Sequence, residues 1–254
     1  MMTGSLQSAG IEAGAKPASE ARIMGLCFRY PLGIAAGVDR TGEQLRSLAK
    51  LACGHVEVGT VSDPRRLRIP ASLGPVAPII GVNIGSLRLG YSSEVLDDYL
   101  ACLAAALPHA DYVVLNFSNE AAQRSLKSDA ARPIVSGARD QIGEYRSRIG
   151  RNIPLLAKLY AGPAGEEMPI PPAAANLLDG FVVVGDSVDR LIELRVAFPL
   201  HAIISVGGVM TGKDARERRR AGADLVQVHS AFAEGGAAHV ETIMRDMERA
   251  TADE

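Results

Sequence analysis

The sequence lacks several features that would place it in a particular class of protein. Its three cysteines are far apart and form no C-x-x-C pair, so we expect reduced structural thiols, a cytoplasmic location and no metal site. The formal net charge of −2 gives no reason to expect nucleic acid or an anionic membrane as a partner. Basic residues gather only locally, at Arg65, Arg66 and Arg68 and over residues 216–220. We expect the second group to lie on the solvent-exposed face of a helix.

Long apolar segments and an export signal are also missing. No apolar run approaches the roughly 20 residues that span a bilayer. The first residues are small and polar, without a charged segment followed by an apolar core, so we interpret residues 1–21 as a flexible tail. The chain is 47% hydrophobic and 22% charged, and its length of 254 residues suits one α/β barrel. We therefore predict a single domain over residues 22–254.

Eight short apolar segments recur along the chain, and few of them alternate apolar and polar residues. Buried parallel strands have this pattern, because helices cover both of their faces. The predicted strands are Leu32–Ala36, His55–Val58, Ile79–Ile84, Tyr112–Asn116, Leu155–Lys158, Gly180–Val184, Ile203–Val206 and Leu225–Val228. Residues with helical spacing lie between most of them, at Glu43–Leu51, Ser93–Leu107, Ala138–Arg148, Val188–Val196, Gly212–Ala221 and Ala238–Ala250.

This alternation of strands and helices predicts a TIM-type (β/α)8 barrel, with an open doubly wound sheet as the competing architecture. One unit is unusual. Pro64, Pro70, Pro75 and Pro78 lie between the second and third strands and leave no room for a crossover helix. We therefore expect an irregular, helix-poor second unit. An incomplete outer ring would expose apolar surface, so a homo-oligomer is one of the arrangements that the sequence allows.

The segment Ser205-Val206-Gly207-Gly208-Val209 is the strongest local signal of a ligand site. A strand runs into two glycines, which allow backbone N–H groups to approach a phosphate, and a helix begins a few residues later. The last strand leads into His229 and Ser230. The loops after strands 7 and 8 commonly bind phosphate in such barrels. These residues predict a phosphate site, and a pair of tight turns that need small residues is the alternative.

Polar side chains also end other strands on the same face of the predicted barrel. Asn83, Asn116 and Lys158 each close a strand, and Ala35-Ala36-Gly37 would let a flat ring lie close to the first strand. An Asn at a strand end is, taken alone, more often a turn former than a ligand. Lys158, however, directly follows an apolar run, which is a poor place for a cation unless an anionic or electron-rich group meets it. Together the three positions favour a ligand site.

In combination these segments resemble the dihydroorotate dehydrogenase family, whose members are FMN-dependent barrel enzymes. The resemblance covers roughly residues 22–245, and it is strongest to the quinone-linked class 2 branch. The matching segments are Met24-Gly25-Leu26-Cys27-Phe28, 31–39, Val56-Glu57-Val58-Gly59-Thr60-Val61, Val82-Asn83-Ile84-Gly85, 97–100, Ala110-Asp111-Tyr112, 205–209 and Leu225-Val226-Gln227-Val228.

The resemblance implies an FMN site at the strand ends. The residues implied to meet the flavin ring or ribityl chain are Ala35, Ala36, Gly37, Thr60, Asn83, Asn116 and Lys158. Those implied to hold the phosphate are Gly207, Gly208, His229 and Ser230, although the family usually has Tyr where His229 stands. By this resemblance Lys158 would place a positive charge beside the flavin and stabilise its anionic reduced form.

The loop after the fourth strand departs from the family pattern. Asn119 stands at the position of the catalytic base, and Ala121 stands where a substrate-binding Asn is expected. An amide cannot accept a proton at a useful pKa, so the ordinary base is missing. Ser118, Glu120 and Ser125 are the candidate replacements, and the sequence does not select among them.

Other substrate segments are altered or shortened as well. Arg40 and Asn116 are the implied substrate-binding residues, with Arg40 in place of the family's lysine. A helical segment of the second unit that supplies another Asn is deleted. The Thr-Asn-Thr expected after the sixth strand is Val184-Gly185-Asp186. Residues 1–21 are too short and polar for the membrane-docking helices of class 2 enzymes, so we expect no membrane anchor and leave the electron acceptor open.

Three functions are compatible with the sequence. The first is an FMN-dependent oxidoreductase of the pyrimidine-biosynthesis type, which moves a hydride from dihydroorotate or a related small ring to flavin, with Ser118, Lys158 and Asn119 at the catalytic positions. The second is an FMN- or phosphate-binding barrel that has lost this reaction and acts as a binding or subunit protein. The third is a non-redox barrel enzyme, such as an isomerase or aldolase, in which Lys158 forms a Schiff base.

Overall fold

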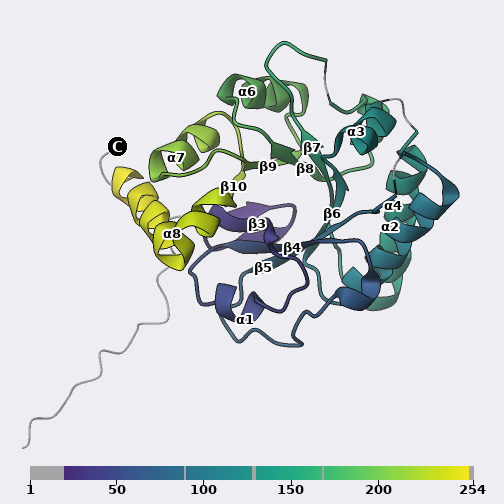
Figure 1. The fold of residues 1–254 in the computed structure, drawn as a ribbon, viewed down its shortest axis with the longest axis horizontal. Coiled ribbons are helices and arrows are strands. Elements are labelled where there is room, and N and C mark those ends of the chain that lie inside the picture. The colour runs from purple at the N-terminus through teal and green to yellow at the C-terminus, as the bar shows by residue number, and fades with distance from the viewer. Residues whose placement is uncertain (1–19, 89, 128–129, 168, 252–254) are drawn as a thin grey trace, which may run out of the picture.

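The chain folds into a closed barrel of parallel strands surrounded by helices (Figure 1). The computed structural model describes residues 20–88, 90–127, 130–167 and 169–251. Around the barrel the strand order is β10-β3-β4-β5-β6-β7-β8-β9, which confirms the TIM-type barrel and excludes the open sheet. Most of the predicted tail, residues 1–19, lies outside the described residues, and Ala21 already belongs to strand β1. Within the described residues, every helix is too short or too polar to cross a bilayer.

Each predicted strand overlaps one strand of the barrel. The barrel strands are β3 (Leu32–Asp39), β4 (His55–Val61), β5 (Ile79–Ile84), β6 (Tyr112–Phe117), β7 (Leu155–Tyr160), β8 (Gly180–Val184), β9 (Ala202–Val206) and β10 (Leu225–Val228). The helices are α1 (Leu45–Leu48), α2 (Ser93–Ala106), α3 (Glu120–Lys127), α4 (Arg132–Ile149), α5 (Pro172–Ala175), α6 (Val188–Ala197), α7 (Gly212–Arg220) and α8 (Ser230–Thr251). The sequence analysis did not predict α3 and α5, because α3 is short and mostly polar and α5 has only four residues.

The last helix begins earlier than the sequence indicated. The prediction started at Ala238, whereas α8 starts at Ser230 and bends at Gly236, where φ is 60° and ψ is −151°. The small residues of this first part, including Gly235 and Gly236, hide the helical pattern. The early start matters for the site, because it brings the beginning of α8 directly to the end of β10.

A short hairpin closes the amino-terminal end of the barrel. It consists of β1 (Ala21–Ile23) and β2 (Leu26–Phe28), which pair in antiparallel register. Phe28 is fully buried, and its ring centroid lies 5.7 Å from that of His55, the first residue of β4. Apolar side chains such as Val114, Leu156 and Ile204 belong to the same interior cluster. The floor of the barrel is therefore filled, so a site that reaches into the barrel interior opens at the carboxyl ends of the strands.

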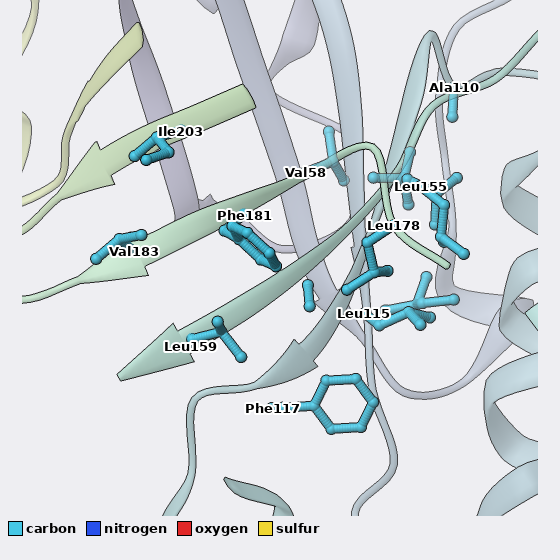
Figure 2. Packing of buried hydrophobic residues seen from close by; sticks show 14 of the residues in the cluster. Val58, Ala110, Leu115, Phe117, Leu155, Leu159, Leu178, Phe181, Val183 and Ile203 are labelled. Carbon is cyan, nitrogen blue, oxygen red and sulfur yellow. The ribbon is translucent and has the colours of Figure 1, made fainter. Parts of the chain in front are cut away.

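A second and larger core fills the space between the barrel and the helices. Figure 2 shows part of it, with Leu115, Phe181 and Ile203 projecting from β6, β8 and β9. Successive residues of a strand point to opposite sides. Phe181 and Val183 therefore join this outer core, whereas Val182 belongs to the interior cluster.

The second unit is irregular, as the prolines predicted. Between β4 and β5 the structure has only the 3-10 turn η1 (Pro64–Arg66) and irregular chain with bends and turns. Leu67, Ile69 and Leu73 of this segment pack against the outer core. The segment itself thus covers the part of the barrel wall that a crossover helix would otherwise cover.

Candidate active site

A cavity of about 510 Å³ opens at the carboxyl ends of the strands. Pockets for small ligands and cofactors typically have volumes of roughly 300–1,000 Å³. The lining residues are Ala36, Gly37, Arg40, Thr41, Thr60, Val61, Ser62, Asp63, Arg66, Ser86, Leu87, Asn116, Ser118 and Lys158. The predicted site residues among them are Ala36, Gly37, Arg40, Thr60, Asn116, Ser118 and Lys158. Strand ends that are far apart in the sequence therefore meet at one cavity.

A buried carboxylate lies beneath this cavity. Glu57 of β4 is fully buried, and its oxygens accept hydrogen bonds from Asn83 Nδ2 and Gln227 Nε2, each at 2.8 Å. Lys158 Nζ lies 3.5 Å from Glu57 Oε1. A carboxylate in a barrel interior is stable only with such partners. Glu57 therefore provides the anionic group that the sequence position of Lys158 required.

A chain of hydrogen bonds continues from Asn83 to the cavity. Thr60 Oγ1 donates to Asn83 Oδ1 at 2.9 Å, and Asn116 Nδ2 donates to Thr60 Oγ1 at 2.7 Å. Ser118 Oγ then donates to Asn116 Oδ1 at 2.7 Å. Asn116 and Lys158 are also direct neighbours in the register of β6 and β7. The predicted polar residues thus form one network with fixed geometry, rather than separate groups at a common edge.

The structure separates the candidates for the catalytic base. Ser118 lines the cavity, whereas Asn119 accepts a hydrogen bond from Ala122 N at 2.8 Å and so caps the start of α3. Asn119 and Ser125 both line a small crevice against α2 and α4 instead. The side chain of Glu120 lies outside the described residues. Among the described candidates, only Ser118 is at the cavity.

The predicted phosphate loop at Gly207 and Gly208 lies close against the loop after β8. Gly207 and Gly208 have φ values of 113° and 67°, and a Cβ atom on Gly207 would lie 3.1 Å from Gly185 O. These left-handed conformations and the close approach require glycine. The first N–H groups of α8, from Ser230 onward, have no acceptor within their helix. Loops with exposed amides and a helix start are a common site for phosphate.

Arg218 of α7 links the loop after β8 to the glycine loop after β9, and this finding corrects the sequence prediction for residues 216–220. Its Nη1 donates to Gly185 O at 2.9 Å and its Nη2 donates to Gly207 O at 3.1 Å. Arg218 is 5% exposed, and burial lowers its pKa. The prediction of a solvent-exposed face was wrong for this residue. The glycines of the two loops have no side chains to block the guanidinium group, which therefore reaches their carbonyl oxygens.

His229 connects the phosphate loops with the cavity. A Cβ atom on Gly37, whose φ is 105°, would lie 2.9 Å from His229 Nε2. The imidazole therefore lies against the end of β3, beside the cavity wall. Ala35 has a different place, because its side chain is 1% exposed and belongs to the interior cluster beneath the cavity.

Several interior polar residues were not predicted as part of the site. Glu57 and Gln227 interrupt apolar strands, and this interruption is the signal that could have identified them. His55 is fully buried, and burial lowers its pKa from 6.5 to about 3. Within the described structure, both ring nitrogens of His55 and the hydroxyl of Tyr112 make no hydrogen bond. Buried polar side chains therefore extend from the site toward the floor of the barrel. Those at the lower end, His55 and Tyr112, have side-chain atoms without a hydrogen-bonding partner among the described residues.

Comparisons with known proteins identify one family. Residues 183–250 match the family model described as dihydroorotate dehydrogenase. The chain is 31% identical to the dihydroorotate dehydrogenase (quinone) of Azotobacter vinelandii, over 88% of this chain and 83% of that protein. It is 28% identical to the enzyme of the same name from Stenotrophomonas maltophilia strain K279a, over 89% and 83% of the two chains.

A solved structure supports the same fold. The structure of DHODH from Eimeria tenella in complex with ferulenol matches with a TM-score of 0.78 at 21% identity, and the match covers 91% of this chain and 83% of that one. From the sequence relatives and the family model, we conclude that the chain belongs to the dihydroorotate dehydrogenase family of oxidoreductases, as a divergent member.

Proposed function

We propose that the protein is an FMN-dependent oxidoreductase of dihydroorotate dehydrogenase type, which oxidises dihydroorotate or a related small ring. The observation that carries this proposal is the network at the inner wall of the cavity. There a buried Glu57–Lys158 ion pair and the hydrogen-bonded series Asn83, Thr60, Asn116 and Ser118 lie together. A role in pyrimidine biosynthesis and a small-molecule substrate are part of the proposal.

The shape and chemistry of the site fit FMN. Ala36 and Gly37 provide a wall with little side chain, against which a flat ring could lie. Lys158 provides a cation held in place by Glu57. Gly207, Gly208, His229 and Ser230 would hold the phosphate. Bound FMN would supply the hydride acceptor, which amino-acid side chains cannot supply themselves.

The proposed roles of the protein groups follow from their contacts. The positive charge of Lys158 Nζ would favour negative charge on a bound electron-accepting ring. Ser118 Oγ lies at the cavity and donates to Asn116 Oδ1. It would accept a proton from the substrate as its own proton passes to water in the cavity, because a hydroxyl that keeps its proton is too weak a base. Arg40, at the end of β3, would bind an acidic group of the substrate.

The proposal is tested with the visible absorbance spectrum of the purified protein, before and after anaerobic dihydroorotate. We expect flavin bands that bleach on addition of the substrate. Protein that remains colourless after incubation with FMN would refute the flavin function. Flavin bands that persist with dihydroorotate would show a cofactor site whose substrate is a different molecule.

The base is tested separately with Ser118→Ala. We expect the variant to keep its flavin and to lose reduction by substrate by about 100-fold or more, the usual range for a general base. Glu120→Gln is the comparison variant, because Glu120 is another sequence candidate. A Ser118→Ala protein that is reduced at the wild-type rate would show that another group accepts the proton.

A barrel that binds FMN but has lost the reaction is the second candidate function. The capping role of Asn119 favours it, because the residue at the family's base position is used here to begin a helix. The Schiff-base alternative receives no such support, because Lys158 is paired with Glu57 and a Schiff base requires a neutral amine. Persistent flavin colour with no reduction by any small ring would favour the second candidate.

A further inference from the structure

The outer rim of the cavity carries two guanidinium groups that no other described group engages directly. Arg40 and Arg66 line the cavity, and neither makes a hydrogen bond or a close ion pair within the described residues. The one carboxylate among the described lining residues is Asp63. It is bound by Arg65, through Nε at 3.0 Å and Nη2 at 3.1 Å, and this hydrogen bonding lowers the pKa of Asp63. Asp63 also interacts electrostatically with Arg66, but one carboxylate that Arg65 already binds does not balance the arginines, so the rim keeps a net positive charge.

The loop that carries Arg40 is fixed by the residue before it. Asp39 is buried, and its carboxylate accepts hydrogen bonds from the backbone N–H groups of Thr41, Gly42 and Gln44 at 3.2, 2.8 and 2.9 Å. A carboxylate with three backbone donors holds its loop in one conformation. The Arg40 side chain therefore begins from a fixed backbone position.

The loop that carries Arg66 is fastened to the first loop. Arg68 N donates to Thr41 O at 2.7 Å. Gly42 has a φ of 97°, and a Cβ atom there would lie 2.9 Å from Ile69 Cγ1 and 3.1 Å from Ile69 N. The close contact of the two loops therefore depends on glycine at this position. As a result, both guanidinium groups rise from one joined rim rather than from two independent loops.

From this arrangement we infer that the site takes a small ring acid with two carboxylates, one for Arg40 and one for Arg66. Guanidinium groups bind carboxylates through paired hydrogen bonds, and two cations at one rim favour a ligand with two negative charges. Dihydroorotate has one carboxylate and would leave Arg66 without a partner. The inference rests on the proposed function, because it names the substrate class of that same site.

Calorimetric titration of the purified protein at low salt tests the inference, with phthalate and isophthalate as dicarboxylate probes and benzoate as the monocarboxylate. A charged hydrogen-bonded contact contributes about 1.5–3 kcal/mol, so we expect a dicarboxylate to bind roughly 10- to 100-fold more tightly than benzoate. Arg66→Gln should remove most of this preference while it leaves benzoate binding nearly unchanged. Arg40→Gln should weaken the binding of the dicarboxylates and of benzoate.

Arg46→Gln is the matched control. Arg46 is exposed on α1 and does not line the cavity, and its replacement changes the net charge by the same amount. A control that weakens dicarboxylate binding as much as Arg66→Gln would refute the inference, because general electrostatics would then explain the binding. A second test needs no variant and measures how the affinity of the wild-type protein for each probe depends on salt. The affinity for a dicarboxylate should fall more steeply with salt than the affinity for benzoate.

The result can be separated from the proposed function. Equal affinity for benzoate and both dicarboxylates, or no binding of any probe, would refute the inference even if the protein is yellow and turns over dihydroorotate. Conversely, dicarboxylate preference in a protein that binds no FMN would support the two-cation rim and refute the flavin function. The absorbance spectrum of the same sample decides between these cases.

Discussion

The inner wall and the outer rim of the cavity are built in different ways. At the inner wall, Glu57, Asn83 and Thr60 lie on strands or at strand ends, and their polar groups are hydrogen-bonded to one another. At the outer rim, Arg40 and Arg66 come from loops, and their guanidinium groups have no hydrogen-bonding partners in the described chain. The difference indicates that the wall is organised before any ligand arrives, whereas we propose that a ligand completes the rim.

This difference also matches the pattern of resemblance to the family. The wall contains the segments that match the dihydroorotate dehydrogenase pattern, and the rim contains the segments that are shortened or replaced. A barrel can change its loops with little effect on its strands, because its core lies below and outside them. We therefore expect replacements at the wall to affect stability and replacements at the rim to affect ligand choice.

The largest effect is expected for Glu57→Ala. The change removes the acceptor for Asn83 and Gln227 and leaves Lys158 as a buried cation without its partner. Breaking a buried ion pair on one side typically costs about 3–5 kcal/mol. Urea unfolding, followed by circular dichroism, measures the loss, and Arg66→Gln serves as the rim control with an expected change within about 0.5 kcal/mol. Similar losses in the free energy of unfolding for the two variants would refute the distinction between wall and rim.

A smaller effect, dependent on pH, is expected for His55→Phe at the lower end of the wall network. The folded-state pKa of His55 is about 3, below its ordinary value of 6.5, so the unfolded chain binds a proton first as the pH falls. Wild-type stability should therefore decrease from about pH 6.5 toward pH 3, with up to about 1.4 kcal/mol per pH unit from this one group. The Phe variant should lack this contribution and be more stable by about 1–2 kcal/mol at neutral pH, because two unsatisfied buried nitrogens are gone.

Urea unfolding at pH 7 and pH 5 compares the two proteins. Phe is close in size to the imidazole that it replaces, and Gly33 leaves space beside it, since a Cβ atom there would lie 2.4 Å from the His55 ring. An identical change of stability with pH in both proteins would show that His55 is not the buried neutral group that the structure describes.

The smallest effect is expected for Asn119→Ala. Loss of the cap at the start of α3 should cost about 1 kcal/mol, with no change in flavin content. Ser118→Ala is its neighbour control, since Ser118 lines the cavity and does not cap the helix. If Asn119→Ala instead abolished substrate reduction at unchanged stability, the residue would act at the site and the separation of the two neighbours would be wrong.

The strands and the inner wall were largely predictable from the sequence. Ile79–Ile84 and Gly180–Val184 have the predicted bounds, because buried parallel strands are apolar throughout and end sharply at polar residues. The same rule predicted that Asn83, Asn116 and Lys158 lie at one end of the barrel. Which groups bond to which could not be predicted, because partners such as Glu57 and Gln227 are 170 residues apart in the chain.

The remaining differences have local physical causes. Strands β1 and β2 have three residues each, too few for a periodic pattern, and their turn depends on Met24 and Gly25 at positive φ. Asn119 resembles a lost catalytic residue when it is aligned with the family, although an Asn before a helix is also a common cap. A run of arginines is typical of a solvated helix face, and only the tertiary contact with the glycine loops buries Arg218.

The filled floor of the barrel has a consequence for how bound molecules enter and leave. Because Phe28 and the hairpin seal the amino-terminal end, a molecule bound at the inner wall must leave through the same mouth by which it entered, past Arg40 and Arg66. An acid bound at the rim, as we propose, would then block the exit of a molecule bound deeper in the cavity. Its affinity would set the lifetime of the deeper complex, so the concentration of a small acid in solution would govern how long a cofactor stays in place.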